Sequence, residues 1–175
     1  MLPPTWISCA RACEVAVGRL ALPETPPDIH AECLFHEKLL VVAGRRSKWF
    51  SRRKVRLADL IDEPWIQTRR EVEPGAPTFE AFKSAGLGRP RVSIFSESLN
   101  LRYSLLETGP YISMIPASAW GLGAKRITLK VLPIEVPPWG QPIAVSVLKD
   151  RTLSPMAQAF VASVREAASP LLKRP

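Results

Sequence analysis

The chain has 175 residues, of which 46% are apolar and 23% are charged. This composition fits one globular domain or two small lobes, and it excludes wholesale disorder. The longest aliphatic run, residues 39–43, is far too short to cross a bilayer. The first residues lack the features of a secretory signal, and three cysteines are too few for a disulfide scaffold. We therefore expect a cytoplasmic protein with no membrane span.

Lysine and arginine number 24 against 16 acidic residues, which gives a formal net charge of +8. Such a balance favours a nucleic acid, an anionic lipid or an acidic ligand as a partner. Seven basic residues lie within residues 45–56, with Trp49 and Phe50 among them. One interpretation is a nucleic-acid patch with stacking aromatics. The other, which we favour, is a solvated loop with the aromatics folded beneath it, because the stretch has no helical periodicity.

Strands and helices alternate along most of the chain. Apolar runs bounded by turn residues predict strands at 15–17, 33–35, 39–42, 65–68, 92–95, 111–115, 127–132 and 142–148. The second and third of these look like a strand pair joined through residues 36–38. Helical patterns occur at 57–61, 78–85, 99–108 and from 155 to about 168. This order predicts an α/β fold with helices against a sheet.

Capping signals indicate where three of these helices begin. Thr78, Ser98 and Ser154 are the expected N-caps, and Pro155 suits the first helical position of the last helix. The stripes expected to face the core on the last two helices are Leu101, Leu105 and Thr108 and, further on, Met156, Phe160 and Val164.

No set of residues with recognisable catalytic spacing is present. The two histidines, His30 and His36, have no further ligands at compact spacing, and Cys9 and Cys13 have no second pair. The sequence contains no G-x-S-x-G turn, no P-loop and no G-x-G-x-x-G fingerprint. We therefore expect a binding protein rather than an enzyme, with no metal and no cofactor.

Five stretches of the chain, each a weak signal by itself, are informative together. They are VAVGRL at 15–20, LFHEKLLVVAG at 34–44, VRLADL at 55–60 with EPWI at 63–66, LLETG at 105–109 followed by ISMIP at 112–116, and LSPMAQAF at 153–160. In this order and at about this spacing they resemble the effector-binding region of LysR-type transcriptional regulators. Residues 147–155 look most like the sugar-responsive branch that includes galactose-binding-protein regulators.

The resemblance implies a type II periplasmic-binding-protein fold, in which two crossover strands join two α/β lobes around a small ligand. Here one lobe is expected to be complete and the other incomplete. Residues 1–27 are assigned to a remnant of lobe I and a crossover, 28–144 to lobe II, and 145–175 to the return crossover and the last helix of lobe I. The hinge is expected at Leu20 and Leu148, and Arg19 is included in the predicted effector site.

The remaining predicted effector residues follow from how such sheets bind ligands. Ligands lie at the carboxyl ends of strands and at helix N-termini, where N–H groups point outward. In the second lobe these positions are Thr68, Thr78, Ser96 and Ser98. Their hydroxyls suit a small polar or anionic ligand. For Thr78 and Ser98 a plain N-cap role is an equally good interpretation.

The chain also departs from the family pattern. The family's winged helix-turn-helix and the opening strand-helix-strand of the first lobe are not found in it, so either a truncated gene product or an excised fragment of a regulator is expected. Contact with DNA is expected only through the missing helix-turn-helix of a parent protein, and homo-oligomers are expected because the family's regulatory regions pair. Two alternatives stay open: a nucleic-acid-binding module using Arg45 to Arg56, and a cytoplasmic solute-binding protein of the same fold.

Overall fold

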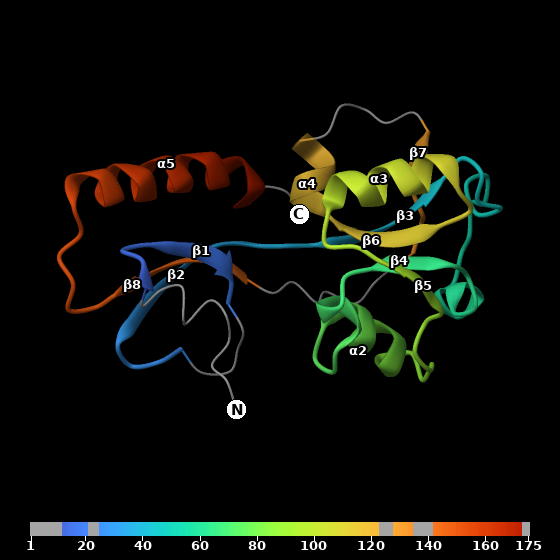
Figure 1. Cartoon of the computed structure of the whole chain (residues 1–175), viewed down its shortest axis with the longest axis horizontal. Helices are drawn as coiled ribbons and strands as arrows, with labels where there is room; N and C mark the ends of the chain where they lie inside the picture. Colours follow the sequence, from blue (N-terminus) through green and yellow to red (C-terminus); the bar gives the residue numbers. More distant parts are fainter. Residues whose placement is uncertain (1–11, 21–24, 123–127, 135–141, 173–175) are drawn as a thin grey trace. The chain divides into compact units, whose positions relative to one another are not determined.

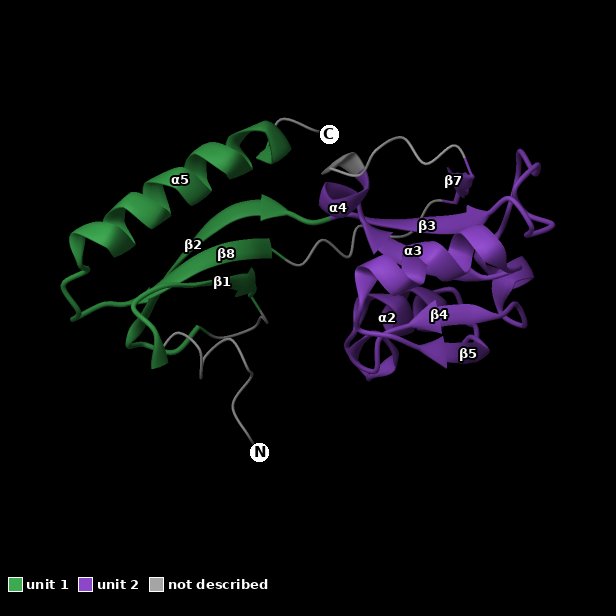
Figure 2. Cartoon of the chain, turned by 45° about the horizontal axis from the view of Figure 1, so that its top comes forward, with its two compact units in different colours: residues 1–37, 140–175 green, residues 38–139 purple. Residues whose placement is uncertain are grey.

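The chain folds into two compact units (Figure 2). Unit 1 combines residues 1–37 with 140–175, whereas unit 2 is the continuous segment 38–139. The computed structural model describes residues 12–20, 25–122, 128–134 and 142–172. None of the helices in these ranges is both long and apolar enough to span a membrane.

The described residues of unit 1 form a three-stranded antiparallel sheet and a long helix (Figure 1). The strands are β1 (Ala16–Arg19), β8 (Pro142–Leu148) and β2 (Ile29–His36), in the spatial order β1-β8-β2. The helix α5 (Pro155–Leu172) places Val161 and Ala168 against Leu34 and Val145 of the sheet. These four buried residues form one apolar cluster of the unit, and Ile29 of β2 centres a second, smaller one.

Ser154 and Glu14 tie the start of α5 to the segment before β1. The Ser154 hydroxyl oxygen accepts a hydrogen bond from the Ala157 N–H at 3.2 Å, which confirms Ser154 as the N-cap, with Pro155 first in the helix. The Ser154 hydroxyl donates to one Glu14 carboxylate oxygen at 2.7 Å, and the Ser154 N–H donates to the other at 3.0 Å. These bonds hold the pKa of Glu14 below its ordinary value.

The buried face of α5 differs from the predicted stripe. Ala157, Val161 and Ala168 are buried, but Met156 is 79% exposed and Phe160 is 51% exposed. Only Val164 of the predicted stripe packs against the core. The helix carries apolar residues on several sides, so spacing by four could not select one face, and the small alanines lie against the sheet instead.

Unit 2 is built on a five-stranded mixed sheet in the order β5-β4-β6-β3-β7. The central β6 (Ile112–Pro116) pairs in parallel with β4 (Trp65–Gln67) and antiparallel with β3 (Leu39–Gly44). Outside these lie β5 (Val92–Phe95), parallel to β4, and β7 (Leu129–Val131), antiparallel to β3. The connecting helices are η1 (Leu57–Leu60), η2 (Arg70–Val72), α2 (Pro77–Ser84), α3 (Leu99–Thr108) and α4 (Ala117–Leu122).

Neighbouring strand residues in unit 2 point to opposite faces of the sheet and enter two different apolar clusters. Trp65 joins the cluster that contains Phe82 of α2, and Ile66 joins the cluster that contains Leu106 of α3. The Trp65 ring meets Phe82 edge-on at 5.6 Å between centroids. The two helices therefore cover opposite faces, as Figure 1 shows.

The stripe predicted on α3 is only partly right: Leu105 packs against the core cluster, but Leu101 and Thr108 are exposed. Leu101 is 49% exposed, and the buried residues of the helix are Arg102, Tyr103 and Leu106. The sequence prediction left out Arg102 because arginine is rarely buried unless it is paired. The bounds of the helix, in contrast, are confirmed, with Ser98 as N-cap and Gly109 directly after it.

The predicted pairing of residues 33–35 with 39–42 does not occur. β2 pairs with β8 over its whole length, whereas β3 pairs with β6 and β7 in the other sheet. The division between units after residue 37 accordingly places β2 in unit 1, while the sequence-based division at residue 28 assigned it to the second lobe. Strand propensity is local, but the choice of partner depends on residues more than 100 positions away.

Gly44 marks a close approach between β3 and α3. A β-carbon at Gly44 would collide with the carbonyl oxygen of Leu106, whereas a β-carbon at Gly18 in β1 would meet no atom within 4 Å. We expect Gly44→Ala to lower the free energy of unfolding by about 3 kcal/mol, and Gly18→Ala to change it little. Denaturant unfolding followed by circular dichroism measures both. Equal stability of the two variants would contradict the close packing.

The lowered pKa of Glu14 gives unit 1 a pH dependence. A carboxylate of lowered pKa stabilises the folded state above its unfolded pKa, about 4.3, and this contribution is lost as the pH falls through the folded pKa. We expect Glu14→Gln to lower the melting temperature at pH 7 but not at pH 2, relative to the unchanged chain. Glu166→Gln on the exposed side of α5 is the control. If the melting temperature of Glu14→Gln is still lower than that of the unchanged chain at pH 2, the charge of Glu14 is not the cause of the destabilisation.

Candidate functional site

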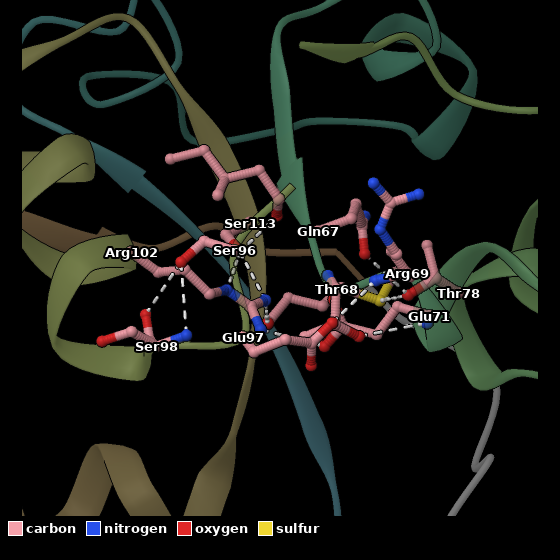
Figure 3. Close-up of polar contacts among 12 residues, drawn as sticks. Gln67, Thr68, Arg69, Glu71, Thr78, Ser96, Glu97, Ser98, Arg102 and Ser113 are labelled. Carbon is pink, nitrogen blue, oxygen red and sulfur yellow. Dashed lines mark hydrogen bonds and ion pairs between the residues drawn. The ribbon is translucent and has the colours of Figure 1, made fainter. Parts of the chain in front are cut away.

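The loops that follow β4 and β5 bring most of the predicted effector residues together (Figure 3). Thr68 follows β4, Ser96 follows β5, and Ser98 caps α3. Because β4 and β5 are parallel, both loops leave the same edge of the sheet. Two hydrogen bonds join the loops: the Ser96 N–H donates to the Gln67 carbonyl at 2.9 Å, and the Arg69 N–H donates to a Glu97 carboxylate oxygen at 3.1 Å.

Ser96 and Ser98 form a compact turn at the start of α3. The Ser98 N–H donates to the Ser96 hydroxyl oxygen at 3.2 Å, and the Ser98 hydroxyl oxygen accepts from the Leu101 N–H at 3.3 Å. Ser96 is buried, whereas Ser98 is exposed. The Ser98 hydroxyl can therefore act as the cap and still donate its proton to a ligand.

Thr68 is held by reciprocal bonds with Glu71. The Thr68 N–H donates to a Glu71 carboxylate oxygen at 2.7 Å, and the Thr68 hydroxyl oxygen accepts from the Glu71 N–H at 3.2 Å. This arrangement fixes the first turn after β4. Thr68 is half-buried, with its side chain at the end of the strand.

Thr78 is not the N-cap that the sequence predicted. The helix α2 begins at Pro77, with Ala76 as the capping residue, because proline is well suited to the first helical position. Thr78 is completely buried in the first turn. Its hydroxyl lies 3.4 Å from the Gln67 carboxamide oxygen and 3.2 Å from the Met114 sulfur. Its direct role is therefore to hold Gln67.

Gln67 is a residue that the sequence analysis missed. It is the last residue of β4, is fully buried, and its carboxamide nitrogen has no hydrogen-bond partner. A buried donor without a partner destabilises a fold by about 1–3 kcal/mol. A polar residue at the end of the otherwise apolar run Trp65-Ile66 was the available signal.

Arg102 is the second missed residue, and it holds the elements behind the site together. It is 3% exposed, and its guanidinium contacts Glu71 at 3.1 Å and the Ser113 hydroxyl oxygen at 2.6 Å. It also donates to the Met114 carbonyl. Ser113 in turn donates to the Ile66 carbonyl at 2.7 Å. The only signal in the sequence was that Arg102 lies four residues before Leu106, which places both on the same face of the helix.

The three predicted residues outside these loops lie in unit 1. Arg19 ends β1 opposite Ile143 and is exposed. The Leu20 N–H donates to the Pro142 carbonyl at 2.9 Å, which continues the pairing of β1 and β8 by one residue. Leu148 ends β8 opposite Ile29. Among the described residues of both units, no group of three or more His, Cys, Asp or Glu side chains could hold a metal ion.

The arrangement in unit 2 is suited to binding rather than to covalent chemistry. It presents the Ser98 hydroxyl, the first-turn N–H groups of α3 and the half-buried Thr68. A helix N-terminus attracts anions and acceptors, because its N–H groups lack intrahelical partners. The guanidinium of Arg69 is exposed beside this edge and lies over the Phe95 ring at 5.4 Å.

Comparison with known proteins gives consistent results. Residues 10–169 match the family described as LysR substrate binding domain. The chain is 26% identical over 139 residues to the transcriptional dual regulator GltC of Bacillus subtilis and 24% identical over 153 residues to the uncharacterized regulator YdcI of Escherichia coli. These alignments cover 79% and 87% of this chain but 46% and 50% of the relatives. The chain thus spans about half the length of the curated relatives it matches.

Solved structures show the same fold. The effector-binding domain of QuiR matches with a TM-score of 0.71 at 20% identity, over 95% of this chain and 78% of that one. The BenM effector-binding domain matches with a TM-score of 0.69 at 22% identity, over 100% of this chain and 79% of that one. The fold is therefore the α/β, type II periplasmic-binding-protein-like architecture of LysR effector-binding domains. The comparisons do not confirm the resemblance to the galactose-type branch.

The buried pair of Arg102 and Glu71 makes unit 2 sensitive to the loss of either charge. We expect Arg102→Met to lower the free energy of unfolding by about 3–5 kcal/mol, because Glu71 is then left buried without its partner. Adding Glu71→Gln should recover part of this loss. Arg165→Met, which breaks an exposed pair with Glu32, is the control and should have little effect. Denaturant unfolding measures all three, and equal losses in Arg102→Met and Arg165→Met would contradict the assignment.

Proposed function

The chain belongs to the LysR substrate-binding domain family, and from this membership we propose that it binds a small polar or anionic effector at the loops after β4 and β5 in unit 2. The observation that carries the proposal is the grouping of Thr68, Ser96 and Ser98 at one sheet edge, beside the N-terminus of α3. Arg19 of unit 1 remains a predicted contact, and Leu20 and Leu148 remain predicted hinge residues.

The donors at this edge favour an effector that carries a carboxylate or several hydroxyls. Ser98 and the first turn of α3 supply neutral donors, and the exposed Arg69, in the loop after β4, places its positive charge over the Phe95 ring at the end of β5. The QuiR domain is described in complex with shikimate and the BenM domain with its effector benzoate, both of which carry a carboxylate at neutral pH. These relatives support a small organic acid more strongly than an uncharged sugar.

Binding in this proposal serves the regulation of transcription. The named relatives are transcriptional regulators rather than enzymes or solute-binding proteins. Sequence-specific contact with DNA is assigned to a helix-turn-helix outside this chain, and a cytoplasmic location follows from the same role. The chain would then supply the effector-sensing part of a regulator.

Self-association is the second part of the proposal. Unit 1 exposes Met156 at 79% and Phe160 at 51% on one side of α5, and Val17 at 45% on β1. In the described sheet β1 pairs on one side only, with β8. Exposed apolar side chains and an open strand edge favour association between chains.

Titration with a panel of shikimate, benzoate and galactose tests the effector site. We expect at least one carboxylate to bind, and Ser98→Ala to weaken it about tenfold, which corresponds to the loss of one hydrogen bond. Ser163→Ala on the exposed side of α5 is the matched control and should leave binding unchanged. Isothermal calorimetry gives the affinities. Carboxylate binding that survives both Ser98→Ala and Thr68→Val would place the site elsewhere.

Light scattering over a range of concentrations tests self-association. We expect the apparent mass to rise with concentration, and Phe160→Glu to shift the equilibrium toward the monomer, because a charge is then introduced into the apolar surface. Leu101→Glu, at an exposed apolar position of unit 2, is the control and should not have this effect. A monomer at all concentrations would contradict the proposal.

A further inference from the structure

The net positive charge of the chain resides entirely in unit 2. Residues 38–139 contain 17 lysines and arginines against 9 acidic residues, an excess of eight, whereas the rest of the chain contains seven of each. Within unit 2 the charge is concentrated further: seven basic residues occur in residues 45–56, and no acidic residue occurs from residue 38 to residue 58. The segment 45–56, called the basic loop below, is therefore a local maximum of positive charge.

The basic loop has a defined backbone. It follows β3 and begins with turns in which the Ser47 N–H donates to the Gly44 carbonyl at 2.9 Å and the Phe50 N–H donates to the Ser47 carbonyl at 3.1 Å. Lys130 of β7 donates to the Arg52 carbonyl at 3.0 Å, so the middle of the loop is held against the edge strand. Figure 1 shows the loop beyond the end of β3, next to β7.

Trp49 and Val55 of the loop face the protein. Trp49 packs against the cluster that contains Trp65 and Phe82, and Val55 is buried in the same cluster. Neither Trp49 nor Phe50 is an exposed side chain. The interpretation of a solvated loop with an aromatic ring beneath it is thus confirmed for Trp49, whose packed ring is not free to stack on bases.

Part of the charge of the loop is paired within unit 2. Lys48 contacts Glu63 at 2.6 Å and Arg56 contacts Asp59 at 2.8 Å. Arg46 donates to the Thr108 carbonyl at 2.8 Å, at the C-terminal end of α3, and no ion pair of Arg46 is found among the described residues. The other four basic residues are exposed and, in the part of the chain that the structure describes, form no ion pair; they are Arg45, Arg52, Arg53 and Lys54.

We propose that the basic loop binds the phosphate groups of a nucleic-acid duplex without reading its sequence. Three of the four unpaired residues are arginines, whose planar guanidinium binds phosphate through two parallel hydrogen bonds. Tight binding of a protein partner would need an apolar or aromatic side chain that becomes buried in the interface. Binding to a membrane would need an apolar side chain that inserts into the lipid. The loop exposes no large apolar residue, so its contact is electrostatic alone, as it is for a phosphate backbone.

The topology separates this surface from the proposed effector site. β4 runs parallel to β6, and β3 runs antiparallel to it. The loop after β3 therefore leaves the end of the sheet opposite to the loops after β4 and β5. Phosphate binding at the basic loop and effector binding at Ser98 are independent proposals, and one can fail while the other holds.

Fluorescence anisotropy with a labelled 25-base-pair DNA of scrambled sequence tests the proposal on the whole chain. We expect binding at about 50 mM salt that weakens steeply with salt, with Arg52→Gln/Arg53→Gln/Lys54→Gln raising the dissociation constant at least tenfold. In this variant the plot of log affinity against log salt concentration should become less steep by about two to three, which is roughly 0.9 per lost phosphate contact. The control Arg89→Gln/Arg91→Gln/Lys149→Gln removes the same charge from exposed sites elsewhere.

Three outcomes would overturn the proposal. They are the absence of DNA binding at 50 mM salt, an equal loss of affinity in the control, and tighter binding of poly-glutamate or of anionic lipid vesicles than of DNA. Circular dichroism verifies that each variant is folded. If the triple variant does not fold, Arg53→Gln and Arg89→Gln are compared singly, with an expected slope change of about one for the first and none for the second.

Discussion

The buried contact between Arg102 and Glu71 is the interaction on which the arrangement of unit 2 depends. It joins the turn after β4 to α3, and the bonds from Arg102 to Ser113 and Met114 extend it to β6. The second carboxylate oxygen of Glu71 holds the Thr68 N–H. A guanidinium removed from water must satisfy its donors internally, and this requirement orients three elements at once.

The same network explains why the proposed effector residues can present free donors. Ser98 lies one turn before Arg102 on α3, so fixing the guanidinium also fixes the start of the helix. The bond between Arg69 and Glu97 joins the two loops directly. A ligand that meets a preorganised set of donors does not have to order them, and the entropic cost of binding falls accordingly.

Strand direction divides unit 2 into two ends of different chemistry. The loops after β4 and β5 carry hydroxyls and a helix N-terminus, which suit a small ligand with one charge. The loop after β3 carries a dense set of exposed arginines and lysines, which suit an extended polyanion. Both surfaces favour anions, but the first does so through short-range hydrogen bonds and the second through long-range charge, which salt screens.

The sequence by itself determined most of the local structure of this protein. The bounds of β5, β8 and α3 were predicted to the residue, as were the caps at Ser98 and Ser154, because turn and capping signals act over three or four residues. The family was also identified from short motifs, several of which coincide with whole strands, such as residues 112–116 in β6. The sequence also placed Thr68, Ser96 and Ser98 directly after two strands, where the structure has them, and their binding of an effector stays a proposal.

Only the tertiary structure decided which strands pair, which helix faces are buried and which polar groups are enclosed. The partner of β2 is β8, more than 100 residues away, and no local signal distinguishes it from β3. The stripes on α3 and α5 were only partly right, with Leu105 and Val164 packed against the core, because each helix has apolar residues on more than one side. Burial of Gln67 and Arg102 depends on neighbours from other elements, so hydropathy along the chain could not reveal it.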